Sequence, residues 1–241
     1  MYTISELYDL THTLAADYLK QFTYPWEVLA DLKDYIISLG NQLNAEEYDE
    51  VSEHVWVHRT AKVMQTAYLG APCIIGAGTE VRHCAFIRGS ALIGENCVVG
   101  NSVELKNVIL FDCVQVPHYN YVGDSILGYK SHMGAGSITS NVKSDKTLVV
   151  VRTVEKQSIY TGLKKFGAML GDYVEVGCNS VLNPGTVVGR NTNIYPLSSV
   201  RGTVPAESIF KTGSVIVNKS SESEWEMRNE QSENEQSEQT K

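Results

Sequence analysis

From Val51 onward, aliphatic side chains recur at every sixth position of the chain. Ten consecutive steps carry such an anchor residue, namely Val51, Val57, Val63, Leu69, Ile75, Val81, Ile87, Ile93, Val99 and Leu105. A period of six is typical of a parallel β-helix, in which each hexad supplies one short strand and one corner. Three hexads close a triangular coil, so residues about 18 positions apart lie above one another at the strand spacing of roughly 4.8 Å.

The repeat continues through two shortened steps and returns after an interruption. Its further anchors are Leu110, Val116, Val122, Leu127, Met133, Leu170, Val176, Leu182, Val188, Ile194 and Val200. The interrupting segment, residues 143–165, has β-rich runs on both sides of Glu155 and Lys156, which predicts an extended loop or hairpin that leaves the helix. Residues 209–217 are predicted to form a closing strand. The predicted fold class is all-β, a parallel β-helix of hexapeptide repeats over residues 51–218.

The first forty residues follow a helical period instead. Thr3 and Glu6 have the spacing of a capping box, and Pro25 opens a second run that Gly40 is well placed to end. We therefore predict two short helices within an N-terminal helical cap, residues 1–50, that packs on the first coil, because terminal repeats need covering. A role in docking a partner is the alternative.

The amino-acid composition differs from that of the rest of the chain mainly at the carboxyl end. The chain has 241 residues, of which 43% are hydrophobic and 20% charged, with a formal net charge of −8. Much of the negative charge lies in residues 219–241, which are predicted to form a disordered acidic tail. A short helix anchored by Trp225 is the alternative. The rest of the chain is only mildly acidic, which argues against a nucleic-acid partner.

The sequence carries neither a membrane segment nor a disulfide framework. No apolar run approaches the roughly 20 residues that span a bilayer, and no basic region followed by an apolar one opens the chain. We therefore expect a cytoplasmic protein with no membrane partner. The five cysteines are odd in number and lack CxxC spacing, so we expect most of them to be small buried residues.

Two basic residues directly follow anchors one coil apart. Arg88 and Lys106 are therefore predicted to stack as neighbouring cations, with Gly123 in the same column. Like charges roughly 5 Å apart repel each other unless an anion or a carboxylate lies between them. One interpretation is a phosphate site, with a planar arginine fork and a lysine point charge. The other is a pair of solvated corner residues that form ion pairs with Glu80 or Glu104.

The stretch 115–141 departs from the repeat through His118, Tyr121 and the shortened steps, and such a departure often marks a functional site. His118 is the candidate active-site residue, although a single histidine is more often structural. A three-histidine zinc site, as in β-helical carbonic anhydrases, is the metal alternative. It would need a histidine four or five residues after His118, where the chain has Val122 and Gly123, so no metal site is expected.

Residues 88–141 carry a resemblance to a known family. Its specific part is the HxxYxGD segment that begins at His118, followed by GAGSIT and Asn141. These motifs resemble the acetyltransferase domain of the bifunctional UDP-N-acetylglucosamine pyrophosphorylase and glucosamine-1-phosphate N-acetyltransferase family. The resemblance covers about residues 57–205, and the nucleotide-binding domain with its Gly-rich loop is not found in this sequence. It implies a left-handed β-helix and a homotrimer.

The resemblance also implies roles for individual residues. His118 is implied as the general base that takes a proton from the amino group of glucosamine 1-phosphate before the amine attacks the acetyl-CoA thioester. An unperturbed histidine pKa of about 6.5 suits this task. The substrate-binding positions fall on Arg88, Lys106, Tyr121, His132 and Lys165. The cofactor-binding positions fall on Asn141 and Cys178.

The sequence departs from the family at two of its positions. His132 stands where the family has a sugar-binding asparagine, and Val142 stands where it has a tyrosine. The interrupting segment is also longer, so Lys164 is the alternative to Lys165. These changes concern the acceptor sugar more than the reaction type. His132 either donates to a sugar hydroxyl or is a solvated corner residue.

The leading hypothesis is therefore an acetyl-CoA-dependent N-acetyltransferase that acts on an amino-sugar phosphate, most simply glucosamine 1-phosphate. Acetyl-CoA would serve as the co-substrate, without a metal, and the sites would lie between subunits of a trimer. The alternative is a non-catalytic β-helix that assembles with, or regulates, a separate nucleotidyltransferase. A metal-dependent lyase on the same fold is the third and least favoured hypothesis.

Overall fold

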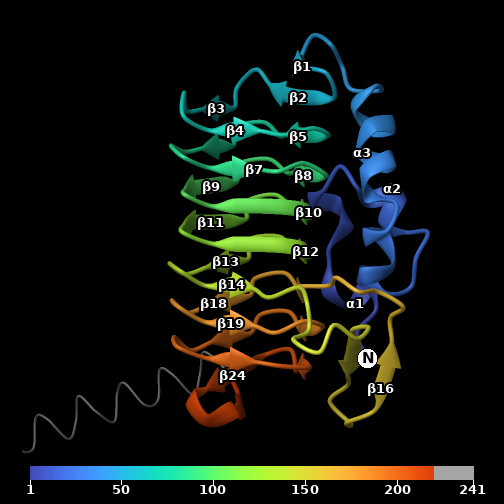
Figure 1. The fold of residues 1–241 in the computed structure, drawn as a ribbon, viewed down its shortest axis with the longest axis vertical. Helices are drawn as coiled ribbons and strands as arrows, with labels where there is room; N and C mark the ends of the chain where they lie inside the picture. The colour runs from blue at the N-terminus through green and yellow to red at the C-terminus, as the bar shows by residue number, and fades with distance from the viewer. Residues whose placement is uncertain (220–241) are drawn as a thin grey trace, which may run out of the picture.

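The computed structural model describes residues 1–219 and shows a left-handed parallel β-helix with short helices along one side (Figure 1). The coils contribute strands to three faces. Two faces share one sheet, because β10 (Glu104–Leu110) and β12 (Tyr121–Leu127) continue across the corner between them. The predicted all-β fold of stacked hexapeptide coils is confirmed.

The three faces follow one another in chain order within each coil. Face 1 consists of β2 (Val55–His58), β5 (Cys73–Ile75), β8 (Ala91–Ile93), the second halves of β10 and β12, β17 (Ala168–Leu170), β20 (Thr186–Val188) and β23 (Thr203–Val204). Face 2 consists of β3 (Lys62–Val63), β6 (Glu80–Val81), β9 (Val98–Asn101), β11 (Gln115–His118), β13 (His132–Met133), β18 (Glu175–Val176), β21 (Asn193–Ile194) and β24 (Ser208–Lys211). Face 3 consists of β4 (Tyr68–Leu69), β7 (Phe86–Ile87), the first halves of β10 and β12, β14 (Ile138–Thr139), β19 (Val181–Leu182) and β22 (Ser199–Val200).

The predicted anchors form the core of the β-helix, with one exception. Those from Ile75 to Val200 are at most 2% exposed. Val51 is 58% exposed, because β1 (Tyr48–Ser52) pairs antiparallel with β2 and takes no part in the coils, so the prediction for Val51 was wrong. The first coil has a stacking neighbour on one side only, and its anchors are half-buried: Val57, Val63 and Leu69.

The amino-terminal segment packs on the first coil, as predicted, through Gly40 and Trp56, but it continues along the side of the β-helix and is not confined to that coil. Instead of two helices, the segment forms α1 (Ile4–Leu7), η1 (Leu10–His12), α2 (Ala16–Leu19), η2 (Pro25–Leu29) and α3 (Leu32–Gly40), which lie along one side of the β-helix (Figure 1). At one end, the Asp172 N–H donates to the carbonyl of Leu7 at 3.0 Å. At the other, Gly40 packs so closely on Trp56 that a Cβ would meet the ring. The helices therefore extend along face 1.

The outward side chains of face 1 explain this placement. They are apolar and at most 1% exposed: Ile74, Leu92, Ile109, Ile126, Met169 and Val187. A strand with apolar side chains on both sides needs cover on both sides. The β-helix interior covers one side of face 1, and the amino-terminal segment covers the other.

The predicted excursion is confirmed as an antiparallel hairpin of β15 (Val150–Arg152) and β16 (Ser158–Tyr160). The carboxyl end differs from the single closing strand that was predicted. There, β24 pairs antiparallel with β25 (Val215–Asn218), and η3 (Thr212–Ser214) joins them. The predicted tail, apart from Lys219, and its Trp225 lie outside the described residues.

All five cysteines are free thiols. Cys73 and Cys97 are buried, and burial raises the pKa of Cys73 to about 12. Cys113 is half-buried, whereas Cys84 and Cys178 are exposed at corners, so the prediction that most cysteines are buried was wrong. The corners turn through residues with positive φ, and exposed Cys84, at 60°, is one of them.

Candidate active site

The corner between faces 3 and 1 brings Arg88 and Lys106 together, as predicted. The β7–β10 register places Arg88 beside Lys106, and the β10–β12 register pairs Lys106 with Gly123. Gly70 precedes Arg88 in the same column. The stacked cations are therefore confirmed as a structural feature. We name Arg88, Glu104, Lys106, Asp124 and Asn141 the carboxylate corner.

Each cation of the carboxylate corner is paired with an acidic side chain. Arg88 Nη1 donates to Glu104 Oε1 at 2.8 Å, and this hydrogen bond raises the pKa of Arg88. Lys106 Nζ lies 3.0 and 3.2 Å from the two carboxylate oxygens of Asp124. Glu104 is thus an ion-pair partner, as one interpretation of the sequence predicted, whereas Glu80 forms its ion pair on face 2.

Asp124 is the residue of this corner that the sequence analysis missed. Its side chain is only 4% exposed, and besides Lys106 it accepts hydrogen bonds from the side-chain amides of Asn107, at 3.0 Å, and Asn141. A buried carboxylate needs such donors to offset the loss of water. The available signal was its position one coil after Asn107, from which its side chain can reach Lys106.

Tyr121 joins the carboxylate corner through its hydroxyl, which accepts a hydrogen bond from Asn141 Nδ2 at 3.1 Å. Burial raises the pKa of Tyr121, and the charge of Asp124 adds to the effect. Gly123 makes this position possible, because a Cβ there would lie 2.5 Å from the tyrosine hydroxyl oxygen. Gly123 therefore leaves the space that the Tyr121 hydroxyl occupies.

The corner between faces 2 and 3 holds His118, at the end of β11. Its imidazole is exposed, and no hydrogen bond or ion pair joins that ring to another side chain within residues 1–219. The Gly136 N–H donates to the carbonyl of His118, and the Asn179 N–H donates to the carbonyl of Ala135, so His118 and Cys178 share one column two strand spacings apart. That separation is roughly 10 Å. We name His118 and Cys178 the histidine corner.

Lys165 lies next to the carboxylate corner along the chain. The N–H of the following residue, Phe166, donates to the carbonyl of Asn141 at 3.0 Å, which closes the excursion at its base. The side chains of Lys165 and Lys164 are both exposed. The two lysines thus remain equivalent candidates for a contact with a ligand at this corner.

His132 joins neither corner within a single chain. It begins β13 on face 2, and its Nδ1 lies 2.8 Å from Glu175 Oε2. The alternative of a solvated corner residue is therefore only partly right, because a carboxylate contacts the ring. Face 3, the width of one short strand, separates the histidine corner from the carboxylate corner.

Within residues 1–219, no group of three or more His, Cys, Asp or Glu side chains is arranged to hold a metal ion. His83, which belongs to the same corner as His118, lies 2.9 Å from the hydroxyl of Thr66. In the same range, none of the helices is both long and apolar enough to cross a membrane.

Known proteins are similar to large parts of this chain. Residues 80–187 match the family described as the GMPPB C-terminal domain. The chain is 29% identical over 190 residues to the bifunctional sugar-1-phosphate nucleotidylyltransferase/acetyltransferase of Sulfurisphaera tokodaii, a match that covers 78% of this chain and 47% of that protein. It is 29% identical over 205 residues to the bifunctional protein GlmU of Methanococcus maripaludis, covering 84% and 49%.

The chain spans about half the length of these curated relatives. Among solved structures, the polySia-specific acetyltransferase NeuO is 15% identical, with 68% of this chain and 76% of that chain covered and a TM-score of 0.44. The resemblance inferred from the sequence motifs is confirmed by the curated relatives: over most of its length, this chain is similar to bifunctional nucleotidylyltransferase/acetyltransferases that act on sugar 1-phosphates.

Proposed function

We propose that this chain is an acetyl-CoA-dependent N-acetyltransferase that acts on an amino-sugar phosphate, with glucosamine 1-phosphate as the first acceptor to test. The observation that carries the proposal is the arrangement of face 3, which has an exposed imidazole at one edge and two stacked cations at the other. The names of the relatives, which combine sugar-1-phosphate and acetyl chemistry, support this acceptor class.

In this proposal His118 is the general base. Its imidazole accepts a proton from the amino group of the acceptor as the nitrogen attacks the thioester carbonyl. The C–N bond forms, the C–S bond breaks, and the imidazolium returns the proton to the leaving thiolate. General-base catalysis of this kind contributes about 10²- to 10⁴-fold in rate. The exposure of His118 is compatible with direct contact with a ligand.

Arg88 and Lys106 are proposed to bind the phosphate, with Lys165 or Lys164 beside them. Their ion pairs leave room for this role, because a guanidinium has five N–H donors and an ammonium has three. Asp124 and Glu104 would hold the two cations in place while other donors turn to the phosphate oxygens. The carboxylates are thus proposed to position the cations, and a dianionic phosphate would offset the repulsion between them.

Asn141 and Cys178 are proposed to border the acetyl group and the coenzyme. They lie at opposite edges of face 3, as His118 and Lys106 do, so one set of side chains from a single copy is spread across an open surface. We therefore propose a homotrimer in which a neighbouring copy completes each site. A contact between His132 and the acceptor sugar would then come from that neighbour, because His132 lies on face 2.

The proposal is tested by incubating the full chain with acetyl-CoA and a panel of amino-sugar phosphates and following thiol release. We expect turnover with at least one member of the panel and its loss with the unphosphorylated sugars. Turnover that is equal with and without the phosphate would refute the role of the carboxylate corner. No turnover with any acceptor would favour the non-catalytic alternative, in which the carboxylates simply neutralise Arg88 and Lys106.

A further inference from the structure

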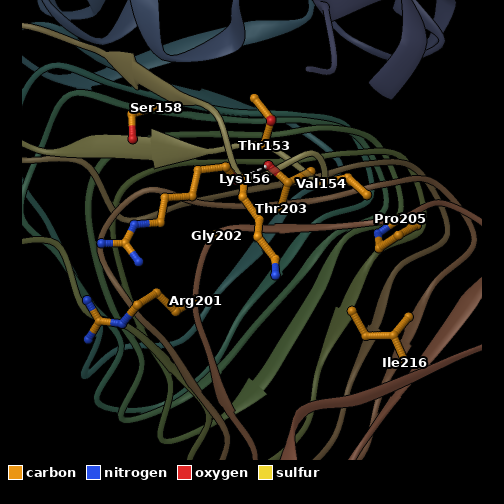
Figure 2. Close-up of a pocket in the computed structure, with 10 residues that line it drawn as sticks. Thr153, Val154, Lys156, Ser158, Arg201, Gly202, Thr203, Pro205 and Ile216 are labelled. Carbon is orange, nitrogen blue, oxygen red and sulfur yellow. Dashed lines mark hydrogen bonds between the residues drawn. The ribbon is translucent and has the colours of Figure 1, made fainter.

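The hairpin β15–β16 packs on the last coils and encloses a hollow there. The hydroxyl of Thr203 donates to the carbonyl of Arg152 at 2.8 Å, and a Cβ at Gly202 would lie 3.3 Å from that same carbonyl oxygen. The cavity between hairpin and coils has a volume of about 420 Å³. Figure 2 shows side chains of the hairpin, including Lys156, and of the coils, including Arg201 and Thr203, around it.

Basic side chains dominate the charge of this hollow. Arg152, Lys156 and Arg201 line it, and a smaller adjoining hollow shares Arg152 and Arg201 and adds Lys143. Among the described residues, no aspartate or glutamate lines either hollow. Lys143 has a partner of its own, Asp145, at 3.3 Å. We name Arg152, Lys156 and Arg201 the hairpin cations.

The hairpin cations are not neutralised by the part of the chain that the structure describes. Arg201 Nη2 donates to the neutral amide oxygen of Asn183 at 3.2 Å, and no ion pair joins Arg152, Lys156 or Arg201 to a carboxylate in residues 1–219. This differs from Arg88 and Lys106, which each have a carboxylate partner. Cations that share a cavity without a counter-charge favour the binding of an anion.

The opposite wall of the hollow is apolar. Val154, Pro205 and Ile216 line it, and the side chains of Val154 and Ile216 are 49% and 42% exposed. A cavity of this size falls within the range of small-molecule sites, roughly 300–1,000 Å³. One charged wall and one apolar wall suit a ligand that joins phosphate groups to a ring.

The hollow lies away from the carboxylate corner. The strand registers place Lys106, Gly123, Ser140, Asn183 and Arg201 in one corner column. Four strand spacings of about 4.8 Å put Arg201 roughly 19 Å from Lys106 along that column. Lys106 and Arg201 also contact different side chains on this column, Asp124 and Asn183, so we treat the hairpin cations as a separate site.

We propose that the hairpin cations form a second anion site, which binds the diphosphate of a nucleotide while the apolar wall contacts its organic part. Both coenzyme A and a sugar nucleotide carry this chemistry. The proposal does not rest on acetyl transfer, because it concerns binding at a cavity that the excursion and the last coils create together.

The test is calorimetric titration of the full chain with inorganic pyrophosphate as the probe. We expect saturable binding that weakens at least about tenfold in Arg201→Gln and in Arg152→Gln, since each removes charge-assisted hydrogen bonds. Arg82→Gln, which changes an arginine on face 2, is the matched control and should bind like the parent chain.

Competition identifies the source of the diphosphate. Coenzyme A and UDP-N-acetylglucosamine are titrated separately against bound pyrophosphate, and displacement by one of them supports the site and names its ligand class. Displacement by neither overturns the nucleotide assignment. Absence of saturable pyrophosphate binding, or equal affinity in both hairpin-cation variants and the parent chain, overturns the site itself. Acetyl transfer is not measured in these titrations, so the proposed function stands or falls separately.

Discussion

Faces 1 and 3 of the β-helix share two strands, yet their surroundings are opposite. On face 1, the outward side chains of β10 and β12 are Ile109 and Ile126, and both are fully buried under the amino-terminal helices. On face 3, the outward side chains of the same strands are Glu104 and Tyr121, and both are partly exposed. The second half of each strand is therefore buried on both sides, and the first half presents polar groups at the surface.

Stability and the candidate chemistry are therefore assigned to different faces of the β-helix. Face 1 is sealed by apolar contacts with the amino-terminal segment. Face 3 is bordered by the carboxylate corner and the histidine corner, where the candidate chemistry lies. Substitutions on face 1 should chiefly change the free energy of unfolding, and substitutions at the edges of face 3 should chiefly change activity.

The largest expected effect is at His118. His118→Ala should lower kcat for acetyl transfer by about 10²- to 10⁴-fold, because it removes the proposed general base. The free energy of unfolding should change by less than about 0.5 kcal/mol, since the ring is exposed. Thiol-release kinetics and denaturant titration measure the two quantities.

His83→Ala is the matched control for His118, because both histidines belong to the corner between faces 2 and 3. It should leave kcat within about twofold of the parent chain. Equal losses in the two variants would mean that the corner needs histidine for packing, and the general-base role would be rejected.

On face 1, Ile126→Ala should lower the free energy of unfolding by about 2–4 kcal/mol, because it leaves a cavity between β12 and the helices. Ile138→Ala removes the same atoms from an outward position on face 3, which is partly exposed, and should cost about 1 kcal/mol or less. Denaturant titration of both variants checks the comparison. Equal costs would contradict the division between a sealed and an open face.

At the shared corner, Lys106→Met should raise the KM for the phosphorylated acceptor by about 10- to 100-fold, with a smaller change in kcat. It also leaves Asp124 buried without its cation, so the variant should be less stable. The double variant Lys106→Met/Asp124→Asn removes that charge. It should recover stability without recovering KM, and recovery of both would show that Lys106 acts only through the fold.

The smallest expected effect is the loss of stability at alkaline pH, which involves the helices on face 1. Burial raises the pKa of Tyr18 and of Tyr35 to about 12, and each hydroxyl donates to a backbone carbonyl, that of Val28 or Leu14. In the unfolded chain a tyrosine titrates near 10, so the folded state keeps protons that the unfolded state loses. The contribution of these two tyrosines to stability should therefore be constant below about pH 10 and be lost between about pH 10 and 12.

The loss should be about 1 kcal/mol per tyrosine at about pH 11, by denaturant titration. Tyr18→Phe should make the decline shallower while it lowers stability at neutral pH by about 1 kcal/mol. A decline of unchanged slope in Tyr18→Phe would assign the alkaline transition to other groups.

The sequence predicted those parts of the fold that repeat at short range. Anchors such as Ile87 and Leu105 recur because every coil needs an inward aliphatic residue, and the hairpin follows from local β-rich runs. The helical period of the first forty residues predicts helices, but it does not predict that they cover face 1. The cover depends on outward residues such as Leu92 and Ile109, which matter only once three faces have been assigned.

The candidate site was predictable to a similar extent. Arg88 and Lys106 were found because they follow anchors one coil apart. Asp124 was missed, because its partners Lys106, Asn107 and Asn141 come from neighbouring coils and meet only at the corner. The resemblance implied a sugar contact for His132, but the coil carries this residue to face 2, where Glu175 contacts it.

The most direct test of the central claim is to identify the product of the full chain incubated with acetyl-CoA and glucosamine 1-phosphate. Mass spectrometry of the sugar fraction, with thiol release measured in parallel, compares the two products. We predict one N-acetylated sugar phosphate for each coenzyme A released, and neither product above background with His118→Ala. Release of coenzyme A without an acetylated amine, or acetylation that survives in His118→Ala, would contradict the assignment of amine acetylation at the edges of face 3.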